Sequence, residues 1–145
     1  MNKSLRFLLL IVLCLLPCMI GMGSNRGESP SGKIPVPVKK FTATFIDQMD
    51  VTTECRDVSI EGGTLIEGKK GDGKFTISFE NINTIVFRLS EGKLSGIIKL
   101  IDGNAIELVL NKDQRVYGNT KYGTFQIKLL DLKKMIIDGS QKRGS

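Results

Sequence analysis

The amino-acid sequence predicts an all-β fold made of two related repeats of about 50 residues each, preceded by an N-terminal signal helix. Three observations lead to this prediction. Apolar and polar residues alternate along several segments, as in strands that bury one face. A fifteen-residue pattern that begins at Gly73 recurs fifty residues later at Gly123. After the signal, no run of ten or more residues has the 3.6-residue period of a helix.

Residues 1–23 have the form of a secretory signal. Lys3 and Arg6 precede an apolar run that ends at Pro17. Gly21 and Gly23 are small residues at the two positions that a signal peptidase requires before its cleavage site. We therefore expect a protein that is exported to the bacterial periplasm or cell envelope.

Two alternatives to cleavage stay open for this segment. Lipidation of Cys18 would make the protein a lipoprotein, although Pro17 stands where a small residue is expected. An uncleaved anchor is the other alternative, but the segment from Phe7 to Met22 is shorter than the roughly 20 residues that span a bilayer. Contact with a membrane is thus expected only through the signal or a lipid anchor.

Four further segments follow the signal. Residues 24–40 are rich in Ser, Gly, Pro and charge, which predicts a flexible linker. Residues 41–90 and 91–138 are the two predicted β-repeats. Residues 139–145, GSQKRGS, are predicted to be a disordered tail.

The repeat is clearest where GKFTISFENINTIVF aligns with GTFQIKLLDLKKMII at an offset of fifty. Phe75, Ile77 and Phe79 alternate with polar residues, which predicts a half-buried strand. In both copies two apolar residues three apart follow, which is the spacing of one tight helical turn. Fourteen of the fifteen positions agree in apolar character, and the offset extends upstream to Val58 and Leu108 without a gap.

Each repeat begins with a predicted hairpin. The runs FTATFID and GIIKLID end at Asp47 and Asp102, and a further alternation follows each. DGN at 102–104 is typical of a tight turn, whereas the first copy has about five extra residues here. Each repeat is then strand, hairpin, strand, glycine-marked turn, strand, helical turn and short strand. The two repeats are expected to form small barrels or one pseudo-twofold barrel or sandwich.

This order of elements resembles the small five-strand barrel of the Src-homology-three or Sm type, in which one short helical turn precedes the last strand. A closer resemblance is carried by GNTKYGTFQIKLLDLKKMI, Gly118 to Ile136. This segment is similar to a β-repeat of uncharacterised exported bacterial proteins. The first copy departs from the pattern at Asp72, where the second has Tyr122. The resemblance implies β architecture and an envelope location, and it brings no established activity.

The residue inventory argues against an enzyme. The chain has no histidine, the commonest general base and transition-metal ligand. Cys55 is the only cysteine after the signal, so neither a structural zinc site nor a Ser-His-Asp or Cys-His site can be assembled. Cys55 shares an alternate-position face with Val51 and Thr53, which favours a small buried apolar side chain. We expect no catalytic residues, no metal and no cofactor.

Carboxylate pairs are the remaining candidates for catalysis. Asp47 with Asp50, and Glu61 with Glu67, lie in turn-like segments rich in polar residues. Side chains there usually face water or cap the backbone. The loop GKKGDGK, Gly68–Lys74, has the glycines of a phosphate-binding loop but lacks its following helix, and a hairpin turn is the simpler interpretation.

The charge distribution argues against nucleic-acid binding. The whole chain carries a net charge of +6, but the region from Phe41 to Asp138 has 13 Lys and Arg against 14 Asp and Glu. Its Phe residues lie mostly on the alternating apolar face and are expected in the core. A basic surface with exposed aromatic residues for base stacking is therefore not expected.

Two tyrosines are the candidate contact residues. Tyr117 and Tyr122 lie near the predicted turn between Arg115 and Lys121, where an exposed ring could contact a partner or a glycan, or could pack within the hairpin. We expect a non-catalytic cell-envelope β-domain for protein interaction or assembly, whose partner is another envelope protein or a second copy. The alternative is a small-ligand or polysaccharide binding module that uses the Tyr117–Tyr122 loop.

Overall fold

The computed structural model describes residues 34–140, which form ten strands and two 3-10 turns, η1 (Phe79–Asn81) and η2 (Leu129–Asp131). The all-β prediction is confirmed. The predicted signal, with Cys18, lies outside the described residues. The strands are β1 Phe41–Asp47, β2 Thr52–Ile60, β3 Leu65–Lys70, β4 Gly73–Ser78, β5 Ile82–Ser90, β6 Lys93–Leu100, β7 Ala105–Leu110, β8 Arg115–Thr120, β9 Gly123–Lys128 and β10 Leu132–Ser140.

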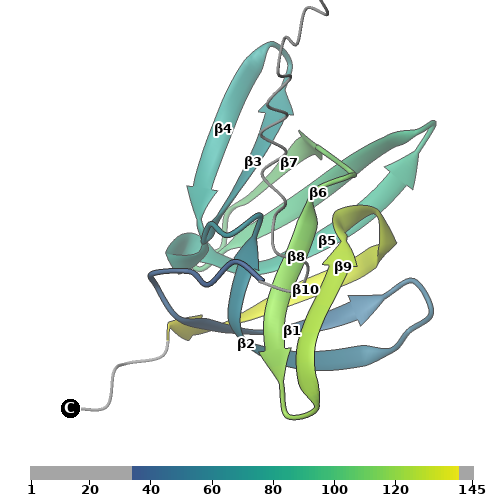
Figure 1. Ribbon diagram of the computed structural model, residues 1–145. Helices are drawn as coiled ribbons and strands as arrows, with labels where there is room; N and C mark the ends of the chain where they lie inside the picture. Colours follow the sequence, from purple (N-terminus) through teal and green to yellow (C-terminus); the bar gives the residue numbers. More distant parts are fainter. Residues whose placement is uncertain (1–33, 141–145) are drawn as a thin grey trace, which may run out of the picture. The chain divides into compact units, whose positions relative to one another are not determined.

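The ten strands form one antiparallel sheet that curls into a half-barrel (Figure 1). Its strand order is β4-β3-β7-β6-β5-β10-β1-β2-β8-β9. Strands β4 and β9 are therefore the two edges. The two repeats share this one sheet and do not form separate barrels.

The sheet has a pseudo-twofold axis between β5 and β10. Ile85 of β5 lies opposite Met135 of β10, and these two residues are related by the offset of fifty. If each strand of one repeat is exchanged for its counterpart in the other, the strand order reads the same in reverse. Each strand thus has its counterpart in the other repeat on the opposite side of this axis.

Each half of the sheet combines strands from both predicted repeats. One half is β4-β3-β7-β6-β5, a continuous segment of chain from Leu65 to Leu110. The other half joins β1 and β2, near the start of the fold, to β8, β9 and β10 at its end. In each half a short 3-10 turn precedes one strand, which is the feature expected from the resemblance to small barrels. The first hairpin of each repeat, however, belongs to the opposite half.

The strand register corrects the alignment of these hairpins. Ile85 pairs with Ile98, whereas Met135 pairs with Phe45, so Phe45 and Ile98 occupy equivalent positions at an offset of 53. The offset of 55 implied by the two aspartates is therefore wrong. The upstream extension at fifty holds through β3 and β8, where Gly68 and Gly118 are equivalent, but it is wrong in β2 and β7. There Leu108 lies opposite Gly96 as Cys55 lies opposite Ala43, an offset of 53. The offset changes near a register shift in β2, between Arg56 and Ser59.

One hydrophobic core fills the concave face of the sheet. The ring of Phe41 meets that of Phe79 edge-on, with centroids 5.7 Å apart, and Phe45 stacks on Phe125 at 5.8 Å. Phe41, Phe45 and Phe79 are almost fully buried. Aromatic pairs in these geometries stabilise a core by about 0.5–1.5 kcal/mol beyond the area that they bury. Both halves contribute side chains to this core.

The ends of the folded part differ from the sequence prediction. The predicted linker reaches residue 40, but Pro37 is buried and Lys39 forms an ion pair with Glu80 at 2.6 Å. The last seven linker residues, 34–40, are thus part of the fold. Gly139 and Ser140, assigned to the tail, belong to β10. Residues 24–33 and 141–145 lie outside the described part.

The two edge strands differ in burial. Phe75 of β4 has 41% of its surface exposed, whereas the equivalent Phe125 of β9 is partly buried against Phe45. The residue equivalent to Phe45 in the other half is Ile98, which offers no ring for stacking. The predicted burial of the β4 face is therefore weaker at Phe75 than the alternation alone indicated.

Candidate functional site

A gap in strand pairing lies beside β2. Along one side, Thr52 to Arg56 pair with β1. Along the other side, pairing with β8 begins only at Arg56, which lies opposite Asn119. The chain of β8 turns away after Thr120, whereas β2 continues for four more residues, Thr52–Cys55. These four residues have no strand partner on this side among the described residues, and they span about 13 Å.

The backbone of β2 presents hydrogen-bonding groups to this gap. Hydrogen-bonded and non-hydrogen-bonded pairs alternate along an antiparallel ladder. The amide of Asp47 donates to the carbonyl of Val51 at 3.1 Å, so the next pair, Ile46 and Thr52, is not hydrogen-bonded. By the same alternation, the N–H and C=O groups of Thr52 and Glu54 point away from β1. Four backbone groups therefore face the gap.

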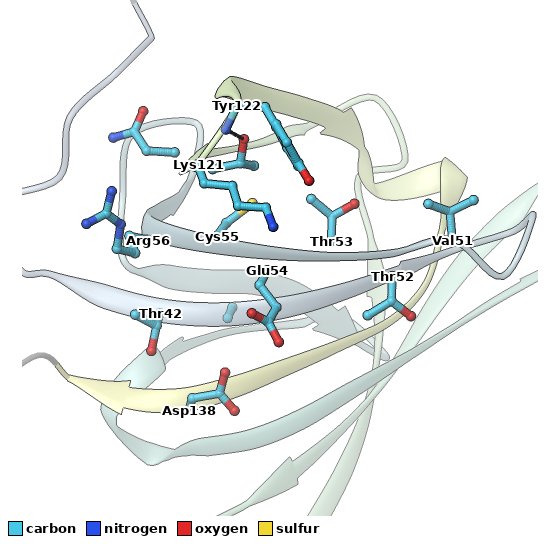
Figure 2. A pocket seen from close by; sticks show the side chains of 13 residues that line it. Thr42, Val51, Thr52, Thr53, Glu54, Cys55, Arg56, Lys121, Tyr122 and Asp138 are labelled. Atoms are coloured by element: carbon cyan, nitrogen blue, oxygen red, sulfur yellow. Dashed lines mark hydrogen bonds between the residues drawn. The ribbon is translucent and has the colours of Figure 1, made fainter.

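The gap is a groove of about 850 Å³ between β2 and the β8–β9 turn. This volume is in the range of small-ligand pockets. Side chains from both faces of β2 line it, as expected for a groove that runs along the edge of a strand. Figure 2 shows Thr53 and Cys55 on the side of β2 that faces Lys121 and Tyr122, whereas Glu54 points to the other side.

The opposite wall is an ordered turn. The hydroxyl of Thr120 donates to the carbonyl of Gly123 at 2.9 Å and accepts the amide of Tyr122 at 3.0 Å. The Lys121 ammonium lies 4.9 Å from the centroid of the Tyr122 ring. The two hydrogen bonds order the backbone of the turn, and 87% of the Tyr122 surface is exposed beside β2. Exposed aromatic rings are common anchors for binding partners.

The pseudo-twofold related position lacks these groups. The turn of the first repeat has Gly71 and Asp72 where the second has Lys121 and Tyr122. An aromatic wall beside a free strand edge is therefore found in one half only. The two halves share a backbone plan, and the difference between them lies in the side chains that a ligand would contact.

Cys55 is a core residue. Its side chain is 3% exposed, which confirms the prediction of a buried apolar side chain. Burial raises the pKa of the Cys55 thiol to about 11. The thiol is therefore protonated at neutral pH, and the reactive thiolate is scarce.

Only one of the two predicted tyrosines reaches the groove. Tyr122 lines it, whereas Tyr117 lies within β8, opposite Ser59 on one side and Gln126 on the other. Tyr117 is half-buried and does not line the groove. The sequence did not identify Thr52–Cys55 as part of the site, since alternation predicts a strand but not which of its edges stays unpaired.

The candidate carboxylate pairs hold turns and surface ion pairs. Each of the four has a partner within the described part of the chain. Asp47 Oδ1 accepts the amides of Met49 and Val51, Asp50 meets Lys133 at 2.6 Å, Glu61 accepts the amide of Arg115 at 2.6 Å, and Glu67 meets Lys74 at 3.0 Å. Between residues 34 and 140, no three His, Cys, Asp or Glu side chains converge as a metal site would require. No helix in that range is long and apolar enough to cross a bilayer.

A protein-family model described as "Uncharacterised protein" matches residues 37–140. The chain belongs to this family. The match starts at the buried Pro37 and ends with β10, so it coincides with the folded sheet. This agrees with the predicted membership of an uncharacterised family, while the repeat motif and the export of the protein stay predictions. No curated protein and no solved structure matches the chain.

Proposed function

We propose that this protein is a non-catalytic interaction domain of the cell envelope, which binds an extended segment of another envelope protein in the groove beside β2. The observation that carries the proposal is the unpaired edge of Thr52–Cys55 opposite the exposed ring of Tyr122. The proposed location follows from the signal-like residues 1–23. An extended partner would add one short strand to the sheet at this point.

Backbone groups would supply much of the affinity. The N–H and C=O groups of Thr52 and Glu54 face the groove and are available to a parallel or antiparallel partner. Main-chain hydrogen bonds of this kind carry little sequence preference, and specificity comes from pockets that receive alternate side chains. The groove is about as long as four residues of a strand, which sets the length of the paired segment at about 13 Å.

The side chains of the groove define the partner's chemistry. On one side of the added strand lie Thr53 and the Tyr122 ring, which suit a small apolar side chain. On the other side lie the carboxylates of Glu54 and Asp138, which suit a basic or hydroxyl-bearing side chain. The preferred segment therefore alternates an apolar residue with a basic or polar one.

The proposal is tested by selecting peptides from a displayed library on the purified protein and measuring their affinities by fluorescence polarisation. Tyr122→Ala is expected to weaken binding at least about tenfold, because exposed aromatic anchors dominate such interfaces. Glu54→Pro removes a groove-facing N–H and is expected to abolish binding. The β1–β2 ladder does not use that N–H, so the fold tolerates the change.

Matched controls lie at the pseudo-twofold related positions. Asp72→Ala and Glu107→Pro change the equivalent turn and the equivalent strand of the other half. Both variants are expected to bind the selected peptides as well as the unmodified protein. Equal loss of binding in Glu54→Pro and Glu107→Pro would contradict the proposal, because it would place the effect outside the groove.

A small-ligand or polysaccharide binding module is the second candidate. Threonine hydroxyls and the amide of Asn119 line the groove beside the Tyr122 ring, and this combination also suits a sugar. A glycan array distinguishes the two candidates. Glycan binding that is lost in Tyr122→Ala but kept in Glu54→Pro would favour the sugar, because stacking on the ring does not need the strand's N–H.

A further inference from the structure

We infer that β4 is a self-association edge, on which a second copy of this chain adds its own β4 antiparallel across a twofold axis. This edge is distinct from the groove beside β2, and the inference does not depend on the proposed function. Strand β4 ends the sheet and pairs only with β3 among the described strands. Figure 1 shows the β3–β4 hairpin at one extremity of the sheet.

The free backbone groups of β4 follow from its turn. Gly71, with φ of +61°, and Asp72 form a two-residue turn between Lys70 and Gly73. Such a turn closes with a hydrogen bond between its outer residues, so Lys70 and Gly73 are a hydrogen-bonded pair. The pairs then alternate along the strand. It follows that the outward-facing backbone groups of β4 belong to its even-numbered residues, which are Lys74, Thr76 and Ser78.

These groups fix the register of a symmetric pair. Outward-facing residues must lie opposite outward-facing residues of the second copy. With Thr76 on the twofold axis, Thr76 faces its own counterpart and Lys74 faces Ser78 of the second copy. All three outward-facing residues of each strand are then paired. In this register the lysines of the two copies do not face each other, and each Lys74 already pairs with Glu67 of its own chain at 3.0 Å.

The side chains of β4 are self-complementary in the same register. Phe75 of one copy lies opposite Ile77 of the other, twice across the axis. Both residues point to the concave face, because Phe75 is paired with Gly68, which approaches Leu108 closely. Phe75 is 41% exposed in the single chain, and its contact with Ile77 would cover it. Aromatic and β-branched residues paired across strands are a favourable combination.

The other edge of the sheet does not have this surplus of exposed apolar surface. Phe125 of β9 is stacked on Phe45 within its own chain. The centre of the sheet also shows that equivalent strands of this repeat pair across an axis, since β5 and β10 do so at Ile85 and Met135. Strand β4 would repeat this arrangement between two chains, and the occupant of its edge is therefore a second copy.

The first test is covalent capture. Residues that face each other on the axis in a hydrogen-bonded pair have Cα atoms about 5.5 Å apart, which a disulfide can span. Thr76→Cys is expected to give a disulfide-linked dimer under mild oxidation. Lys74→Cys is expected to stay monomeric on a non-reducing gel, because each Lys74 faces Ser78 of the second copy and lies far from the other Lys74. Gln126→Cys, the equivalent position on β9, is expected to do the same.

The second test uses sedimentation velocity and needs no cysteine. The unmodified protein and Gln126→Pro are expected to sediment as dimers, and Thr76→Pro as a monomer. Thr76→Lys, which brings two like charges together on the axis, checks the result if the proline disturbs folding. Monomeric unmodified protein, or a dimer that persists in Thr76→Pro and Thr76→Lys, would overturn the inference. So would capture through Gln126→Cys in place of Thr76→Cys.

Discussion

The close approach of β8 to β2 at Gly118 gives a quantitative test of the packing. An added Cβ at Gly118 would lie 2.7 Å from Cys55 Cβ, 3.2 Å from its sulfur and 3.3 Å from Val58 Cγ1. Ordinary contacts of a Cβ atom begin at 3.4 Å. The backbone of β8 or β2 must therefore shift in Gly118→Ala. Overpacking of this kind costs about 1–3 kcal/mol.

The pseudo-symmetric position makes the prediction sharper. At Gly68 the added Cβ would lie 2.6 Å from Leu108 Cβ, 2.9 Å from Leu110 Cδ2 and 3.0 Å from the carbonyl of Val109. The third contact is with backbone and is not relieved by a rotamer change. We therefore expect Gly68→Ala to be at least as destabilising as Gly118→Ala. Gly73 has no atom closer than 3.5 Å, so Gly73→Ala serves as the control.

The assay is urea unfolding followed by circular dichroism. For a domain of this size, 1 kcal/mol corresponds to about 4–8 °C in a thermal melt, which gives a second readout. Cys55→Gly removes the two closest atoms and is expected to recover part of the loss in Gly118→Ala, measured as a coupling energy in a double-mutant cycle. If Gly118→Ala unfolds with the same midpoint as Gly73→Ala, the close packing of β8 on β2 is refuted.

Three further predictions concern buried side chains. The pKa of Cys55 is raised from 9.0 to about 11 in the fold, so its contribution to the free energy of unfolding is fully present below pH 9 and is lost as the pH rises to about 11. In Cys55→Ala, the free energy of unfolding should lack this decrease between pH 9 and 11. An equal decrease in the variant would contradict the prediction. The Ser59 hydroxyl is buried without a hydrogen-bond partner among the described residues. Ser59→Ala should therefore raise the free energy of unfolding or change it by less than about 0.5 kcal/mol. A larger decrease would show that the hydroxyl has a partner after all. Phe45→Ala should lower the free energy of unfolding in urea by about 3–5 kcal/mol, because it leaves a cavity at a fully buried site and removes the stack with Phe125. A decrease below about 1 kcal/mol would show that this ring does not stabilise the core.

The strands and their turns could be predicted from local patterns. Alternation depends on which face of a strand is buried, and this is the same whatever strand lies beside it. The short turns before Ile82 and Leu132 were also predictable, because their spacing of three is local. The aspartates at 47 and 102 do cap turns, through the amides of Met49 and Asn104 respectively.

The partners of each strand could not be predicted. A period of two leaves the neighbour undetermined, so the exchange of first hairpins between the halves has no local signal. The two capping aspartates suggested an offset of 55 because each ends an apolar run. The ladder instead aligns Phe45 with Ile98, which places Asp47 and Asp102 at different points of their turns. Side-chain capping tolerates such a shift, whereas the core does not.

The candidate site could be predicted only in part. Tyr122 was identified because an aromatic residue in a polar turn is unusual. Its partner surface, Thr52–Cys55, depends on β2 being longer than β8, and strand lengths are set by pairing partners that the sequence does not name. Tyr117 has the same composition-based signal as Tyr122, but its position within β8 places it against Ser59 and Gln126.

The assembly of one half from both ends of the fold has a consequence for biogenesis. The hairpin of β1 and β2 is made first, yet its neighbours β8 and β10 are among the last segments to leave the ribosome. Until Ser140 has been synthesised, Phe41 has no strand to lie against on that side. In a chain that is truncated near its C-terminus, the N-terminal hairpin therefore lacks the strand that pairs with β1. The sheet can be completed only after synthesis of the chain is almost finished.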